Sequence, residues 1–367
     1  MSAIQSYLDQ AVAAFDYGSP VTETVPISSG HVNVTYCVHT RSGKRYVLQR
    51  INSLAFHRPD QVMDNALRIT DHLRQALARQ GGDVRRGALR FMPTRDGRAF
   101  FTDSAGEVWR VYPFVERTVC LQRAETSELF AAAARAFGRF QQMLRDFPAG
   151  TLHETIPHFH DTPDRLRKFR LALEADRLGR AAEVEAETDF ILRREADCSV
   201  AMDALRAGKL PLRVTHNDTK LNNVLLDEDT GEGVCVIDLD TVMPGLAIND
   251  FGDAIRFGAN HCDEDEKDLS RVNFDLDLFA IYTRGYLEGT GGSLTDQELQ
   301  YLPWGAKLMT LECGIRFLTD YLEGDVYFST SYPGQNLDRC RTQLKLTADM
   351  ERSWQAMGDI VERCRVR

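Results

Sequence analysis

The chain has 367 residues, of which 43% are hydrophobic, and a formal net charge of −10 at pH 7. This length and composition are those of a globular protein with room for two lobes, each with its own core. The acidic balance argues against nucleic acid or an anionic membrane as the main partner. We expect no signal peptide and no membrane-spanning helix, because the N-terminus lacks a basic start and no apolar run reaches about 18 residues. Scattered cysteines without a C-x-x-C pair indicate free, mostly buried thiols and a reducing, cytoplasmic location.

The first third of the chain alternates between strand and helix patterns. Apolar residues at helical spacing predict helices over residues 3–16 and 59–79. β-Branched and aromatic runs predict strands at 25–38, interrupted by a turn at 28–33, and then at 45–51, 99–102 and 108–114. The last of these strands is expected to run into a hinge.

The rest of the chain is mostly helical in pattern. Amphipathic spacing predicts a long helix over 127–147, charged helices over about 164–207 and helices from 293 onward. The segment 153–163 contains histidines and acids, but their spacing matches no structural zinc site and no cysteine pair accompanies them. We interpret this segment as a loop that either shapes a binding pocket or simply lies at the surface.

The chain is organised around residues 212–258. His216-x-Asp218 is followed by Asn223, an apolar run, a polar turn and a second apolar run that ends at Asp238. This order predicts a loop and a hairpin, and a hairpin brings the start of its first strand beside the end of its second. Asp218, Asn223 and Asp238 should therefore converge at one end of the hairpin.

Phosphoryl transfer requires this set of side chains. One carboxylate orients the attacking hydroxyl and accepts its proton, while an amide oxygen and a second carboxylate hold magnesium on the nucleotide phosphates. The spacing is that of a protein-kinase catalytic loop, although His-x-Asp alone is also common in turns and helix caps. We predict Asp218 and Lys220 as catalytic residues, Asn223 and Asp238 as metal ligands, and His216 as a structural prop.

With these residues, and with Ile237-Asp238-Leu239-Asp240 after the hairpin, the sequence resembles the aminoglycoside phosphotransferase and choline kinase superfamily. The resemblance implies an α+β, protein-kinase-like fold of two lobes. The N-terminal lobe, residues 1–116, would carry an antiparallel sheet, bind the nucleotide and end in the hinge. The mainly helical C-terminal lobe, residues 117–367, would provide the catalytic and substrate-binding groups.

Longer runs resemble, within that superfamily, the N-acetylhexosamine 1-kinases. These runs are 156–163, 212–223 and 311–325. The resemblance implies an enzyme that uses ATP and Mg²⁺ to phosphorylate the anomeric hydroxyl of N-acetylglucosamine or N-acetylgalactosamine. The expected partners are therefore a small sugar and ATP, without nucleic acid or membrane.

The resemblance also implies a nucleotide site. The turn at 28–33 would cover the phosphates, and main-chain groups near the hinge would contact the adenine. Gln49 stands where a kinase normally carries a phosphate-binding lysine, so positive charge must come from elsewhere, with Lys220 the first candidate and Arg50 the second. The residues expected at the nucleotide are Ser28, Gly30, His31, Asn33, Gln49, Phe114 and Val115.

The substrate site is expected on the C-terminal helices. Glu312, Arg316 and Asp320 are four residues apart and should share one helix face. This spacing is also typical of an exposed ion-pair ladder, but the resemblance favours a face that recognises sugar hydroxyls. The residues expected at the substrate are Asp218, His31, Arg316 and Asp320, and Asp240 is expected as a further metal ligand.

A second Asp-rich segment follows the hairpin and includes Asp250-Phe251-Gly252. It comes too late to supply the metal-binding aspartate, and the resemblance implies that it braces the catalytic loop from the start of a helix. Two alternatives remain open for the protein as a whole. One is a kinase of an aminoglycoside, choline or an unmodified hexose, and the other is an inactive nucleotide-binding scaffold, which the glutamine at position 49 would suit.

Overall fold

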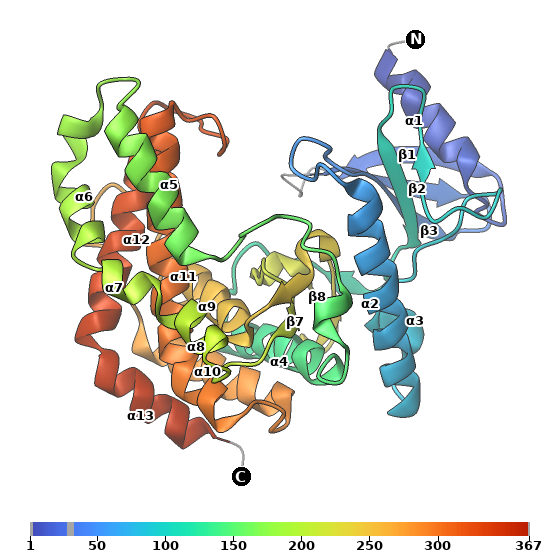
Figure 1. The fold of residues 1–367 in the computed structure, drawn as a ribbon. Helices are drawn as coiled ribbons and strands as arrows, with labels where there is room; N and C mark the ends of the chain where they lie inside the picture. Colours follow the sequence, from blue (N-terminus) through green and yellow to red (C-terminus); the bar gives the residue numbers. More distant parts are fainter. Residues whose placement is uncertain (1–2, 28–32, 366–367) are drawn as a thin grey trace.

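The structure is a computed structural model that describes residues 3–27 and 33–365. It has the kinase-like fold that the sequence predicts, with an antiparallel sheet in the N-terminal part and helices in the C-terminal part. Figure 1 shows the sheet and its helices in blue to cyan at one side, and the helical part in green to red at the other. Strand β5 leads from the first part into the second.

The N-terminal part is a five-stranded antiparallel sheet in the order β1-β2-β3-β5-β4. Its strands are β1 (Val21–Ile27), β2 (Val34–Thr40), β3 (Arg45–Arg50), β4 (Phe101–Thr102) and β5 (Val108–Pro113). The register pairs Thr35 on β2 with Gln49 on β3, and Gln49 with Arg110 on β5. Residues directly opposite one another on antiparallel strands share a face of the sheet, so these three side chains form a row.

Three helices accompany the sheet, namely α1 (Ala3–Ala14), α2 (Pro59–Arg79) and α3 (Val84–Gly87). Helix α2 begins at Pro59, as the sequence predicts, and its apolar face is buried. The buried Asn65 of α2 donates hydrogen bonds to the carbonyl oxygens of His153 and Val242, at 2.8 and 3.0 Å. Helix α2 therefore joins the sheet to the C-terminal part rather than packing on the sheet alone.

The chain crosses between the two parts after Pro113. Strand β6 (Thr118–Val119) already pairs with β8 (Val224–Asp227), which pairs with β9 (Gly233–Val236). Strands β7 (Arg213–Thr215) and β10 (Met243–Gly245) form a separate pair. We propose residues 1–116 and 117–367 as the two domains. The reason is that β5 still pairs within the N-terminal sheet, whereas β6, a few residues later, pairs with a strand of the C-terminal part.

The C-terminal part is built from helices that surround the catalytic segment. The α-helices are α4 (Ser127–Met143), α5 (Thr162–Ala175), α6 (Glu185–Leu192), α7 (Glu195–Cys198), α8 (Val200–Arg206), α9 (Ala247–Gly258), α10 (Leu276–Thr290), α11 (Asp296–Glu323), α12 (Gln335–Arg352) and α13 (Trp354–Cys364). The 3₁₀ turns are η1 (Ala149–Thr151), η2 (Ala181–Val184), η3 (Leu221–Asn223) and η4 (Leu239–Thr241).

Helices α9 and α11 cross at close range in the core. A Cβ atom on Gly252 would lie 2.1 Å from the carbonyl oxygen of Gly305, and one on Gly305 would lie 2.1 Å from the carbonyl oxygen of Ile248. Glycine is therefore required at both positions. Because α9 carries Asp250 and Asp253, this contact fixes the position of both acids.

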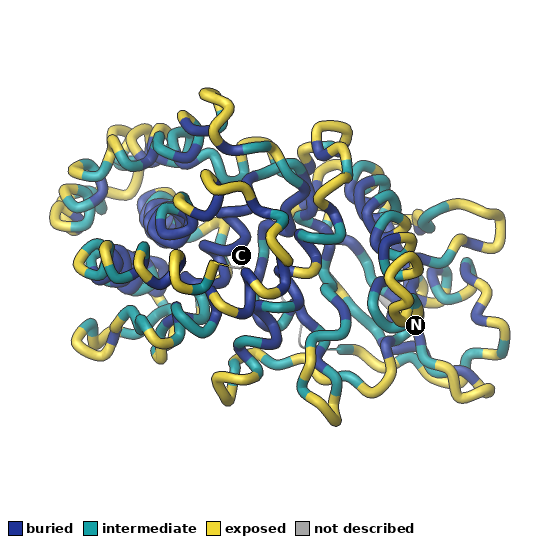
Figure 2. Tube along the Cα trace, turned by 90° about the horizontal axis from the view of Figure 1, so that it is seen from below, coloured by how far each residue is buried: buried dark blue, intermediate teal, exposed yellow. Residues whose placement is uncertain are grey.

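The buried residues lie mainly along the helices of the C-terminal part and where that part meets the sheet (Figure 2). One apolar cluster combines β3 and α2 residues, such as Val47 and Met63, with Phe140, Leu239 and Val242 from beyond the hinge. The two parts thus share a core at their junction. Within residues 3–27 and 33–365, no helix is both long and apolar enough to cross a bilayer.

Candidate active site

A cleft of about 340 Å³ lies between the two parts. Residues of β2, β3 and β5 line it from the N-terminal side, and the 218–223 loop and Asp238 line it from the other. Of the residues predicted for the nucleotide and the chemistry, those that line the cleft are Asn33, Gln49, Phe114, Val115, Asp218, Lys220, Asn223 and Asp238. Ser28, Gly30 and His31 lie outside the described residues. The convergence of Asp218, Asn223 and Asp238 at one end of the hairpin is therefore present in the structure.

Asp218 is held by two neighbours. Its Oδ1 pairs with Lys220 Nζ at 2.8 Å, and its Oδ2 accepts a hydrogen bond from Asn223 Nδ2 at 3.0 Å. Burial would raise the pKa of Asp218, but the positive charge of Lys220 and the hydrogen bonds outweigh it and hold the pKa below its ordinary value. The same ion pair raises the pKa of Lys220. Asp218 is therefore an oriented carboxylate, ionised at neutral pH.

His216 is a structural residue of this loop. Its side chain is buried between Phe137 and Phe140. The ring Nδ1 accepts a hydrogen bond from the main-chain N–H of Asp218 at 3.3 Å, so Nε2 donates to the carbonyl oxygen of Ile237 at 2.8 Å. The two ring nitrogens thus connect the 216–218 loop to the residue after β9, as expected for a structural histidine.

Asp250 and Asp253 brace the loop from α9. The carboxylate of Asp250 accepts hydrogen bonds from the main-chain N–H groups of His216 and Asn217, both at 2.8 Å. Asp253 Oδ2 accepts one from the N–H of Thr219 at 2.9 Å. Asn217 itself has a φ of 64°, a left-handed conformation that such bonds stabilise. Asp250 is thus part of the scaffold beneath Asp218, as the sequence interpretation holds.

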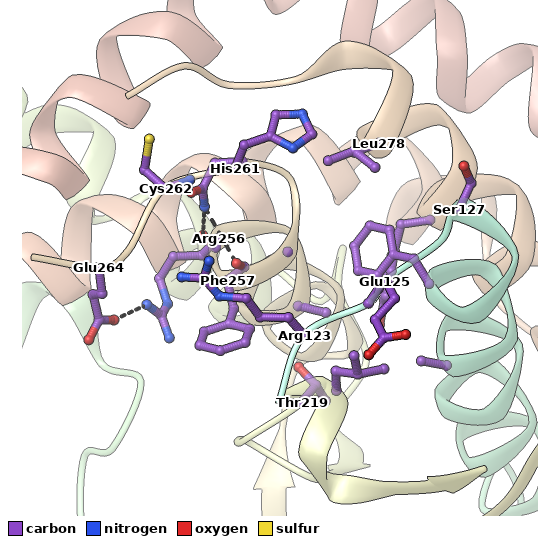
Figure 3. A pocket seen from close by; sticks show the side chains of 18 of the residues that line it. Arg123, Glu125, Ser127, Thr219, Arg256, Phe257, His261, Cys262, Glu264 and Leu278 are labelled. Atoms are coloured by element: carbon purple, nitrogen blue, oxygen red, sulfur yellow. Dashed lines mark hydrogen bonds and ion pairs between the residues drawn. The ribbon is translucent and has the colours of Figure 1, made fainter. Parts of the chain in front are cut away.

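A second cavity, of about 420 Å³, borders the same loop at Thr219 (Figure 3). Thr219 and Leu221 line it, whereas the alternate residues Asp218 and Lys220 line the cleft. Its buried Arg256 pairs with Glu264 at 2.7 Å and with Asp253 at 3.1 Å. Arg256 therefore supports the acid that holds Thr219.

Asp238 follows β9 in a left-handed conformation, with a φ of 59°. Burial, reinforced by the negative charges of Asp240 and Asp218, raises the pKa of Asp238 to about 6. Its carboxylate makes no hydrogen bond or ion pair with the described residues, and Asn223 Oδ1 likewise accepts no bond from them. The two carboxylate oxygens of Asp238 and Oδ1 of Asn223, in a site crowded with negative charge, fit a divalent cation such as Mg²⁺.

Asp240, which the sequence predicts as a metal ligand, instead forms contacts within the protein. It is buried, its Oδ1 is paired with Arg110 Nη1, and its Oδ2 accepts a hydrogen bond from Asn33 Nδ2 at 2.6 Å. Because both oxygens are engaged within the protein, we do not retain Asp240 as a metal ligand. It joins the sheet to the catalytic segment instead.

Arg316 lies on α11 among aromatic rings. Its guanidinium carbon lies 5.2 Å from the ring centre of Phe159, 5.4 Å from that of Phe328 and 5.9 Å from that of Tyr327. No carboxylate of the described residues pairs with it. Its guanidinium also donates no hydrogen bond to the described residues, so its N–H groups are available to a ligand.

Asp320, one turn further along α11, is not available as predicted. It is 2% exposed, and its two oxygens accept bonds from the main-chain N–H groups of Val326, Tyr327 and Phe328 at 2.7–2.9 Å. Asn336 Nδ2 donates a further bond at 2.9 Å. The carboxylate thus folds the 326–328 loop over Arg316. Because both of its oxygens are engaged within the protein, we do not retain Asp320 as a direct sugar contact.

The 153–163 segment is fixed to the same helix. His160 Nδ1 and Thr162 Oγ1 donate to the two oxygens of Glu312 at 2.9 and 2.7 Å. The charge and hydrogen bond of His160 counteract burial and lower the pKa of Glu312. These contacts position Phe159 next to Arg316, so the 153–163 segment forms part of the surroundings of Arg316.

Comparison with known proteins identifies the family. Residues 23–287, more than half of the chain, match the model of the phosphotransferase enzyme family known as APH. The chain belongs to this phosphotransferase family. Solved structures of similar fold are also found.

Three of these structures show how far the likeness extends. An aminoglycoside phosphotransferase from Alicyclobacillus acidocaldarius is 15% identical with a TM-score of 0.63, over 97% of this chain and 95% of its own. A microcompartment-associated aminopropanol kinase is 18% identical with a TM-score of 0.62, over 96% and 98%. An amicoumacin kinase, solved with AMP-PNP and Ca²⁺, is 16% identical with a TM-score of 0.57, over 94% and 93%. At these identities the likeness shows the fold.

This phosphotransferase departs from the kinase pattern at Gln49, and the structure shows its surroundings. Gln49 Oε1 accepts two hydrogen bonds from Arg110, a residue that is absent from the predicted site. Arg50, on the adjacent position of β3, does not line the cleft, whereas Lys220 does. The sequence feature that indicates a role for Arg110 is its place inside the apolar run 108–112, because a buried charge requires a partner.

Proposed function

We propose that this phosphotransferase transfers the terminal phosphoryl group of ATP to the anomeric hydroxyl of an N-acetylhexosamine, giving the sugar 1-phosphate. The observation that carries phosphoryl transfer is the grouping of Asp218, Lys220, Asn223 and Asp238 in one cleft. The choice of sugar rests on the resemblance of three sequence runs and on the surroundings of Arg316.

The roles in the cleft follow from the contacts. Asp218 is ionised and oriented, so it aligns the attacking hydroxyl and accepts its proton. An anomeric hydroxyl is more acidic than an ordinary alcohol, which suits a carboxylate of lowered pKa. Lys220, 2.8 Å from Asp218, stabilises negative charge on the group in transfer.

Asn223 Oδ1 and the Asp238 carboxylate would hold Mg²⁺. The metal supplies neutralisation of the phosphate charges when bound. Asn223 also keeps Asp218 in place through its amide nitrogen, so one side chain would link the base to the metal. The cleft wall near Phe114 and Val115 would accept the adenine.

Arg316 favours a neutral acceptor. An unpaired guanidinium repels the ammonium groups of aminoglycosides and choline, but it can donate to hydroxyl and acetamido oxygens of a sugar. The aromatic rings of Phe159 and Tyr327 beside it offer flat apolar surface to a sugar ring. Phosphorylation of a cationic amino alcohol or aminoglycoside is the second candidate, favoured by the activities named for the structurally similar kinases.

The test is release of ADP from MgATP with a panel of acceptors. We expect turnover with N-acetylglucosamine or N-acetylgalactosamine, little with glucose or galactose, and none with kanamycin or choline. Turnover with kanamycin or choline alone would replace the sugar proposal with the second candidate. ATP binding without turnover on any acceptor would instead support a non-catalytic scaffold.

A further inference from the structure

The cleft face of the sheet carries a continuous polar chain at the position where a kinase keeps its lysine. Gln49 Nε2 donates to Thr35 Oγ1 at 3.2 Å, and Gln49 Oε1 accepts from Arg110 Nε and Nη2 at 3.0 and 2.9 Å. The three residues are cross-strand neighbours on β2, β3 and β5. Their side chains are therefore joined in the same order as the strands.

Arg110 fixes which way the amide of Gln49 faces. A guanidinium has only donors, so the Gln49 oxygen must point toward Arg110 and the amide nitrogen must point away. Gln49 lines the cleft, and Arg110 does not. One of the two hydrogens on Nε2 is used by Thr35, and the other has no partner among the described residues. Gln49 thus presents an N–H donor, rather than a carbonyl oxygen, from this face of the sheet.

Arg110 is itself held firmly. It is 2% exposed and pairs with Asp240, which is 3% exposed. Asp240 also accepts a hydrogen bond from Asn33, whose Oδ1 accepts one from the main-chain N–H of Asn52 at 3.0 Å. The chain of contacts therefore runs from the sheet to the catalytic segment and back to the end of the predicted phosphate turn.

We propose that Gln49 and Arg110 together replace the missing lysine: Gln49 donates an amide hydrogen bond to a phosphate oxygen of the nucleotide, and Arg110 is the positioning residue that aims it. The inference rests on the proposed function, since it concerns the nucleotide of that reaction. In a lysine-bearing kinase the lysine both neutralises and orients the phosphates. Here the charge of Arg110 is already balanced by Asp240, so Lys220 and the bound metal would neutralise the phosphates. Gln49 would orient a phosphate through its hydrogen bond.

Gln49→Glu is the sharpest test. Glutamate keeps an oxygen for Arg110 and nearly the same shape, but it exchanges the donor for a second acceptor that repels phosphate. The measurement is equilibrium binding of MgATP and of adenosine, which has no phosphates, to the full-length protein. We expect the Kd for MgATP to rise at least about tenfold, and the Kd for adenosine to change less than about twofold.

Three further variants separate this effect from charge and from folding. Lys44→Gln, at the exposed turn between β2 and β3, makes the same change in net charge and should leave the MgATP-to-adenosine ratio unaltered. Gln49→Met removes the donor without adding charge and should raise the ratio by a smaller factor. Arg110→Lys keeps the ion pair with Asp240 but loses the two hydrogen bonds to Gln49 Oε1. It should therefore also raise the ratio of the Kd for MgATP to the Kd for adenosine.

The outcomes distinguish the inference from the function on which it rests. An unchanged ratio in folded Gln49→Glu overturns the inference and leaves the kinase proposal standing. An equal loss of affinity for MgATP and adenosine also overturns it, because it indicates a general disturbance of the cleft. Failure of the unaltered protein to bind MgATP overturns the proposed function itself.

Discussion

The ammonium of Lys220 lies 2.8 Å from Asp218 Oδ1, and this contact makes Asp218 a weaker base that is reliably ionised. Asn223 holds the other carboxylate oxygen. The geometry of the proposed base is therefore determined by two side chains that we also propose to act on the phosphates and the metal. Changes at each of these residues should have separable effects.

Asp218→Asn should fold normally and lower kcat by at least about a hundredfold, because the amide cannot accept the hydroxyl proton. Steady-state rates with MgATP and the best acceptor, together with a thermal melt, provide the measurement. Glu228→Gln, an exposed change on the turn of the same hairpin, is the matched control and should retain full activity. A turnover of Asp218→Asn close to that of the unaltered protein would refute the assignment of the base.

Lys220→Met should lower kcat by about 10²-fold or more, while the KM for MgATP rises less. The reason is that Lys220 is expected to act on charge that develops during transfer. Lys220→Arg, which keeps the charge, should recover part of the loss. If both variants change only the KM for MgATP, Lys220 serves ground-state binding and the proposed role is wrong.

Asp238→Asn should make the metal-free protein more stable while abolishing turnover. The pKa of about 6 in the folded protein lies above the ordinary value of 3.8, so the folded state favours the neutral form and ionisation at pH 7.5 costs stability. We expect a gain of about 1–3 kcal/mol above pH 6, measured by urea unfolding in EDTA. The gain should shrink as the pH falls from about 6 toward 4, where the native aspartate becomes protonated.

The metal gives the complementary readout. Added Mg²⁺ should raise the melting temperature of the unaltered protein and have little effect on Asp238→Asn. Equal stabilisation of both proteins by Mg²⁺ would place the metal elsewhere.

Asp320→Ala should loosen the 326–328 loop, because it leaves three main-chain N–H groups and the Asn336 amide without their acceptor. We expect a loss of about 2–4 kcal/mol in the free energy of unfolding and a raised KM for the sugar, with the KM for MgATP nearly unchanged. Glu323→Ala, exposed on the same helix, is the control. An unchanged sugar KM in a destabilised Asp320→Ala would mean that the loop has no part in acceptor binding.

Arg316→Met tests acceptor choice. Removing the guanidinium should raise the KM for an N-acetylhexosamine by about tenfold or more and should reduce the discrimination against cationic acceptors. Rates with N-acetylglucosamine and with kanamycin measure both effects. A variant with unaltered sugar kinetics would remove Arg316 from the substrate site.

Much of the fold could be predicted because local patterns decide it. Helix α2 begins at Pro59, and the hairpin of β8 and β9 lies where its apolar runs are, since these elements follow from capping and alternation. Helix α10 was not predicted. Much of its surface is buried, including Phe279, Tyr282 and Tyr286, so its sequence lacks a clear polar face.

The site was predicted where spacing along the chain determines it, and missed where distant segments meet. His216, Asp218, Asn223 and Asp238 belong to one loop and hairpin, and their convergence follows from that. The pairing of Arg110 with Asp240 depends on how the sheet meets the catalytic segment, 130 residues further on. Asp320 shares a helix face with Arg316, but helical spacing does not reveal that a loop returns to occupy its carboxylate.

Phosphorus NMR of the product tests the central claim most directly. The protein would be incubated with MgATP and N-acetylglucosamine or N-acetylgalactosamine, and the product's phosphorus signal examined for coupling to the anomeric proton. Our account predicts a sugar 1-phosphate with that coupling, and loss of the signal in Asp218→Asn. A phosphate on another hydroxyl, or product formed only from kanamycin or choline, would contradict it.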